Sequence, residues 1–228
     1  MHITMKTLKF VPPILIAVAC LGLQQAKADT STFFLGSTNF NGFTNINMVQ
    51  VSITTTNNSN QATVSFTSQT ANVGGTNYIF MIGSSNAFDL NTSAAATTGN
   101  YAFTQPMNGG FSPPSVPAGG ANGSGQVGQF GMFNNTNTMF NGFSTAVTGV
   151  TFTLTRMSGV WGSAASVLLA NANNQLAAAH IFITQAPGNL SNGTIFTGFA
   201  AVPDGGTTVM LLGVALGALG IVRRFIMS

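Results

Sequence analysis

The chain has 228 residues, of which six are Lys or Arg and three are Asp or Glu, so its formal net charge is +3. All the lysines and two of the three arginines lie near the chain ends. Between residues 29 and 201 only Arg156 opposes Asp29 and Asp89, and one minus two gives −1. A nucleic-acid-binding surface needs a basic face to neutralise phosphates. This composition therefore excludes nucleic acid as a partner.

The N-terminus has the layout of a secretory signal peptide. Lys6 and Lys9 precede an apolar run over residues 11–23, which is short for a transmembrane helix. Ala26-Lys27-Ala28 fits the small-x-small cleavage pattern. We predict that residues 1–28 are removed; an uncleaved anchor is the alternative.

Cleavage after Ala28 leaves Asp29 as the new N-terminus, which we expect to be frayed. Cys20, the only cysteine, lies in the removed part, either as an apolar filler or as part of a poor lipoprotein cleavage site. Without it the mature chain has no thiol for a disulfide, for catalysis or for a metal.

The C-terminus, residues 202–228, forms a segment of three parts. It begins with the short motif Val202, Pro203, Asp204, Gly205 and Gly206. An apolar run over residues 207–222 follows, and Phe225 to Met227 extend it toward the length of a membrane span. Arg223 and Arg224 stop the run, and positive charge favours the cytoplasmic side. Lysines at the other end do the same, so the body between them is expected outside the inner membrane.

This segment resembles the PEP-CTERM class of C-terminal sorting signals, and in particular the variant with a Val-Pro-Asp-x-Gly motif. Val202, Pro203, Asp204 and Gly206 match that motif, and Gly205 fills its variable position. The resemblance implies processing by an exosortase, a membrane-embedded cysteine transpeptidase of Gram-negative bacteria that make extracellular polysaccharide. Such an enzyme recognises the motif, cuts near it and passes the body to the envelope, the cell surface or the extracellular matrix.

Residues 29–201 have the patterns of an all-β domain, a single β-sandwich or jelly-roll-like ectodomain of seven to nine strands. Three segments alternate between apolar and polar residues, and the first two form a hairpin around Asn57 to Asn60. Two denser apolar segments fit strands covered on both faces. The expected strands, with the weaker ones last, are 49–54, 62–67, 150–155, 78–82, 180–184, 32–35, 127–133 and 194–200.

Two further segments have other signatures. Residues 163–176 could form one or two helical turns, because they hold four Ala. Residues 107–128 are rich in Gly and Pro and predict a long loop of unknown role. The second half, from 150 to 198, also resembles the ectodomains of exported PEP-CTERM proteins of unassigned activity, which implies a shared all-β domain and no chemistry.

Catalytic and metal-binding hypotheses have few residues to use. Residues 29–201 have no Glu, so a two-carboxylate glycosidase lacks its pair. His180, Asp89 and a serine could form a triad, but no nucleophile-elbow pattern accompanies them. Asp89 with Asn86 and Asn91 could bind calcium weakly; an Asx turn after a strand is the alternative. We expect no enzyme activity, no cofactor and no metal.

A binding hypothesis rests on Trp161, with Arg156 nearby. An exposed indole with a cation beside it would suit a sugar, and the Asn- and Thr-rich surface, Tyr78 and Tyr101 add to that case; a buried Trp161 with a packed Arg156 stem is the alternative. The sequence therefore predicts a non-enzymatic envelope or matrix protein processed by an exosortase. Binding of extracellular polysaccharide is the second hypothesis, and a hydrolase the third.

Overall fold

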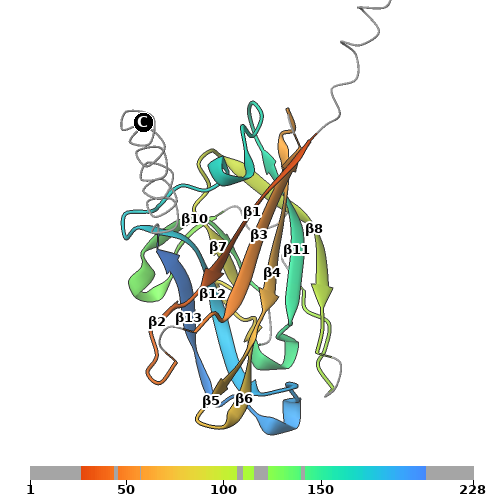
Figure 1. The fold of residues 1–228 in the computed structure, drawn as a ribbon. Helices are drawn as coiled ribbons and strands as arrows, with labels where there is room; N and C mark the ends of the chain where they lie inside the picture. Colours follow the sequence, from red (N-terminus) through yellow and green to blue (C-terminus); the bar gives the residue numbers. More distant parts are fainter. Residues whose placement is uncertain are drawn as a thin grey trace, which may run out of the picture.

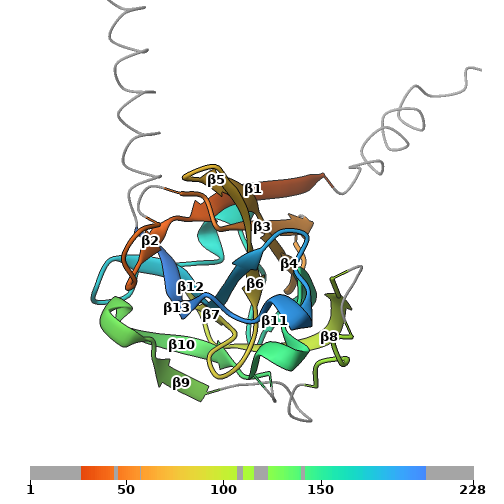
Figure 2. The same cartoon turned by 90° about the horizontal axis from the view of Figure 1, so that it is seen from below.

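A computed structural model describes residues 27–43, 46–56, 58–106, 110–115, 123–139 and 142–203. These residues form two open antiparallel sheets that share one apolar core, which makes a β-sandwich (Figures 1 and 2). The predicted all-β class is confirmed. Within the described residues there is no helix long and apolar enough to cross a membrane. The predicted sorting helix and most of the signal peptide lie outside them.

The first sheet has the order β1-β3-β4-β11-β8. Its strands are β1 (Ala28–Leu35), β3 (Val49–Thr56), β4 (Gln61–Ser68), β11 (Gly149–Arg156) and β8 (Ala96–Thr104). Along β3 and β4 every second residue is buried, as the alternation predicts, and the two strands pair as the expected hairpin. The inward side chains of this sheet form one wall of the core.

The second sheet has the order β2-β13-β12-β7-β10-β9, with β6 also paired to β12 and β5 to β6. Its strands are β2 (Ser37–Thr38), β13 (Phe196–Pro203), β12 (Gln175–Gln185), β7 (Phe88–Leu90), β10 (Met132–Asn137), β9 (Gly123–Gln126), β6 (Thr76–Ile82) and β5 (Thr70–Val73). The central strand β12 is buried on both faces over most of its length, as its apolar density predicts.

The strand count is higher than predicted, and the thirteen strands of the described residues exceed the eight of a jelly roll. Two of the additional strands lack the expected pattern: β9 reads Gly-Ser-Gly-Gln and falls within the predicted 107–128 loop, and β7 has three residues. The prediction also missed the nine-residue β8, which is interrupted at Asn100, with φ of 54°, where its pairing to β11 shifts register. The predicted 127–133 strand is wrong before Met132. Gly128 and Gly131 have φ of 46° and 90°, and a 3-10 helix, η1 (Gly128–Phe130), lies between these backbone turns.

Three other short 3-10 helices connect the strands: η2 (Gly142–Thr145), η3 (Ala164–Ser166) and η4 (Leu190–Asn192). The predicted helical turns over 163–176 reduce to η3. Ser163 caps it, since its hydroxyl accepts the N–H of Ser166 and the Ser166 hydroxyl accepts the N–H of Ser163.

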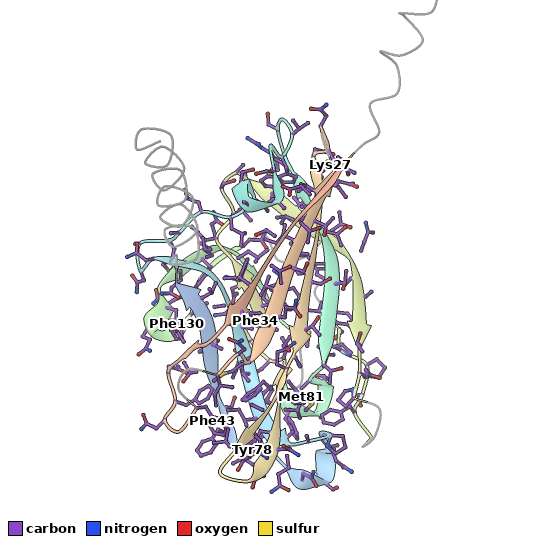
Figure 3. All side chains as sticks on the ribbon, viewed as in Figure 1. Lys27, Phe34, Phe43, Tyr78, Met81 and Phe130 are labelled. Atoms are coloured by element: carbon purple, nitrogen blue, oxygen red, sulfur yellow. The ribbon has the colours of Figure 1, made fainter. Side chains whose placement is uncertain are left out.

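Aromatic rings fill the centre of the sandwich. Phe152 of β11 lies 5.1 Å from Phe88, 5.8 Å from Tyr101 and 6.3 Å from Phe66, measured between ring centroids. These four rings come from both sheets, so they join the two layers. A second aromatic group, around Phe43 and Tyr78, lies near the end opposite Lys27 (Figure 3).

We expect Phe152→Ala to destabilise the fold by about 3–5 kcal/mol, because it removes a fully buried ring shared by both sheets. Thr153→Ala is the control, since Thr153 is the next residue and faces outward; its cost should stay under about 1 kcal/mol. Urea unfolding of both variants measures the difference. Equal costs would contradict the placement of Phe152 at the centre of the core.

Candidate functional site

The predicted sorting motif begins inside the folded sheet. Strand β13 extends through Val202, which pairs with Ala177, and Pro203, which pairs with Gln175. Val202 packs partly buried against the main core. The first two residues of the motif are therefore part of the second sheet. Proline has no N–H for a ladder, which fits a strand that ends at Pro203.

The other residues of this prediction, Asp204, Gly205, Gly206, Arg223 and Arg224, lie outside the described residues. The same holds for Ala26 of the cleavage site.

The predicted new N-terminus is also part of the sheet. Ala28 and Asp29 begin β1 and pair with Thr56 and Thr55. The Asp29 carboxylate accepts the backbone N–H of Ala164 at 2.8 Å, at the start of η3. The prediction of a frayed Asp29 is wrong, because this bond and the β1–β3 ladder both restrain it.

The connection between β11 and β12 lies near both described ends of the chain. The connection 157–174 starts where β11 stops, contacts Asp29 through η3, and finishes at Gln175, opposite Pro203. Figure 1 shows this teal connection at the end where β1 begins, and Figure 3 labels Lys27 there. We call this end of the sandwich the terminal end.

His180 does not assemble a catalytic triad. Its Nδ1 lies 3.0 Å from the Ser85 carbonyl oxygen, which can only accept, so Nδ1 carries the proton. Nε2 then accepts the Thr197 hydroxyl at 2.8 Å. Burial lowers the pKa of His180, opposed by the bond to Ser85, and the ring lies between Phe182 and Phe199. Both nitrogens are therefore engaged by groups other than a carboxylate or serine hydroxyl.

Asp89 lies in the middle of β7, between Thr136 of β10 and Ala178 of β12, and is fully buried. It therefore does not close the turn that the sequence predicts. Burial raises the pKa of this carboxyl well above its ordinary value, and the backbone N–H of Asn137 lowers it only in part. This environment favours the neutral acid, which is a poor ligand or general base.

The other two residues of the weak calcium hypothesis, Asn86 and Asn91, have structural roles. The Asn86 amide donates to the Gln126 carbonyl, and the Asn91 amide donates to the Leu169 carbonyl, so both serve as loop anchors. In the part of the chain that the structure describes, no three His, Cys, Asp or Glu side chains come together to hold a metal.

Trp161 is only 2% exposed, so it is not the sugar-stacking platform of the binding hypothesis. Its backbone N–H bonds to the Ser59 carbonyl, which fixes the 157–174 connection to the β3–β4 turn. The Arg156 guanidinium lies 5.3 Å from the Trp161 ring centroid and donates to the Val160 carbonyl. The pair is a structural contact at the terminal end.

The outer face of the first sheet is covered with hydroxyl groups. Two rows cross β1, β3, β4 and β11 in register, and every position in both is Thr or Ser. We call this surface the hydroxyl face: Thr30, Thr54, Thr63 and Thr153 in one row, Thr32, Ser52, Ser65 and Thr151 in the other. Neighbouring hydroxyls bond at 2.9 Å (Thr30–Thr54) and 2.8 Å (Ser65–Thr151).

A third row on the same face carries Phe34, Gln50 and Thr67. Phe34 is partly exposed on β1 (Figure 3). The alternation of these strands predicted that their apolar side faces the core. The Asn- and Thr-rich surface supported the polysaccharide hypothesis, but the sequence alone did not predict that the Thr and Ser side chains form rows across four strands.

These observations define an all-β exported protein whose last strand continues directly into a C-terminal sorting segment. Residues 201–225 match the VPDSG-CTERM motif, a variant of the PEP-CTERM-like sorting signals of exosortase substrates. The chain therefore carries an exosortase sorting signal, and its precursor is membrane-associated. The match starts at Ala201, inside β13. No curated protein and no solved structure matches the chain.

The burial of Asp89 predicts a specific pH dependence. The Asp89 carboxyl has a higher pKa in the folded protein than in the unfolded chain, where it is ordinarily near 3.8. Its contribution to the free energy of unfolding is therefore fully present below the pKa of the unfolded chain and is lost as pH rises through the pKa of the folded protein. We expect Asp89→Asn to remove this loss and to stabilise the protein at neutral pH by on the order of 1–3 kcal/mol.

Urea midpoints over a pH series test this expectation. His180 works in the opposite sense, because its lowered pKa destabilises the fold as pH falls below the ordinary value. It is present in both proteins, so it cancels from their difference. Parallel pH profiles for the parent and Asp89→Asn would contradict a buried carboxyl with a raised pKa.

Proposed function

We propose that this chain is the precursor of a non-enzymatic structural protein of the cell envelope or extracellular matrix, and that the β-sandwich is the delivered part. The observation that carries this proposal is the sorting motif, which continues the last strand of the sandwich without an intervening domain. Cleavage near the motif would leave the sandwich as the product.

A structural role is also supported by how the chain uses its reactive groups. His180 has both nitrogens in hydrogen bonds, and Asp89 is sealed between β10 and β12. General acid–base catalysis needs a group that can reach a substrate proton. Neither residue is arranged to do so, and the bonds of His180 instead connect β12 to the Ser85 loop and to β13.

The sorting proposal is tested by the intact mass and terminal peptides of the protein from its native host. We expect a first residue at Asp29 and a last residue within 202–206, with any added group visible as extra mass. A Pro203→Ala and Asp204→Ala double variant should accumulate uncut. Recovery of a parent protein that still ends at Ser228 would contradict processing at the motif.

A second candidate function is binding of a neutral polysaccharide on the hydroxyl face. Each hydroxyl can donate one hydrogen bond and accept two, so bonds within a row leave positions for a ligand. The eight side chains carry no charge, which suits an uncharged polyol. The exposed ring of Phe34, in the next row, could cover the apolar side of a sugar ring.

We expect a Thr54→Val and Thr63→Val double variant to lower binding to the host's own polysaccharide by about tenfold, because two hydrogen bonds of about 0.7 kcal/mol are lost. Valine keeps the branched shape and the strand preference of threonine. Thr70→Val, on β5 of the other sheet, is the matched control. Equal retention of all three proteins on the polysaccharide would remove the hydroxyl face from consideration.

A further inference from the structure

Strand β13 leaves little chain between the sandwich and the membrane. It ends at Pro203, and the apolar run starts at Thr207. Four steps between Cα atoms reach at most roughly 14 Å. In the membrane-associated precursor the end of β13, and with it the end of the 157–174 connection at Gln175, is therefore held close to the lipid headgroups.

The terminal end carries exposed apolar side chains, which we call the apolar rim: Met132, Met157, Val160 and Leu169. Their exposed fractions are 50%, 71%, 44% and 61%. Three come from the 157–174 connection. The fourth is tied to it, since the Asn171 amide donates to the Met132 carbonyl at 3.1 Å.

The loops that carry the rim are fixed, so these side chains are presented on a defined surface. The backbone N–H of Met157 bonds to the Ala95 carbonyl at 2.9 Å, and that of Leu169 to the Asn91 carbonyl at 2.9 Å. The Val160 carbonyl accepts the Arg156 guanidinium. Arg156 places a half-buried cation at the same end, near anionic headgroups.

We propose that the apolar rim inserts into the headgroup region of the bilayer and seats the sandwich on the membrane before it is cut. Apolar side chains at this interface are stabilised by the apolar area that they bury. A cation beside them is attracted to anionic lipid. Two other exposed large apolar residues, Ile195 and Phe196, lie toward the opposite end, where β13 begins. They provide an internal control.

The inference rests on the sorting segment and is tested on the full chain. Cys20→Ser removes the native thiol, and Leu169→Cys or Met157→Cys then supplies a single labelling site for an environment-sensitive fluorophore. Ile195→Cys, 40% exposed at the opposite end, is the matched control. The chain, made without exosortase, is reconstituted in phosphatidylethanolamine–phosphatidylglycerol vesicles and isolated by flotation.

We expect blue-shifted emission at residues 169 and 157, and loss of most of it with brominated acyl chains, whereas the label at 195 keeps its emission in water. Water-like emission at all three sites in floated vesicles would overturn the rim but leave the sorting proposal intact. Shielding of residue 169 only when exosortase is added would also overturn it, since the enzyme would then be the occupant. A chain that fails to float would overturn both proposals.

Discussion

The pairing of β12 with β13 is the interaction on which the rest of the molecule depends. β12 joins β13 on one side and β6 and β7 on the other, so one strand holds most of the second sheet together. Ala177, Ala179, Ile181 and Ile183 place its inner side in the core. Because β13 runs through Val202 and Pro203, the same ladder also fixes the start of the sorting motif.

Folding of the sandwich therefore also orders the start of the motif. The first residues of the sorting segment are in a strand with eight paired positions. A chain whose sandwich is incomplete would present a longer free segment than a folded chain. In the folded chain the sheet therefore holds Val202 and Pro203, the first two residues of the motif.

The sandwich carries few charges, and this determines the chemistry of its surface. With Asp89 sealed and Asp29 bonded to η3, solubility rests on hydroxyl and amide groups. On the first sheet these groups form ordered rows, since strand geometry repeats side chains on one face every two residues. Such rows satisfy each other in part, as Thr30 and Thr54 do, and still offer hydrogen bonds to water or to a sugar.

Sequence patterns predicted the parts of the fold that depend on hydrophobic alternation. The strands around Val51, Val64 and Phe152 were found because each buries every second side chain. Strands β7 and β9 were missed, since three residues or a Gly-Ser-Gly run hold no period, and their pairing comes from distant partners. The C-terminal motif was found from its residue types. Its pairing was not, because Val202 differs from a linker residue only through contact with Ala177.

The candidate site residues were also predicted only in part. Composition gives residues 29–201 a single Lys or Arg residue, Arg156, but it could not place single polar residues. His180 bonds to Ser85 and Thr197, 95 and 17 residues away, and Asp89 lies beside Thr136 and Ala178. Trp161 stands alone in the sequence and is buried only because the 157–174 connection folds back onto the β3–β4 turn. That same fold-back brings Met157 and Leu169 to the end from which the chain leaves for the membrane. The 157–174 connection thus closes the core through Trp161 and also carries Met157 and Leu169 of the apolar rim. Packing of Trp161 therefore fixes the surface that we propose to face the bilayer.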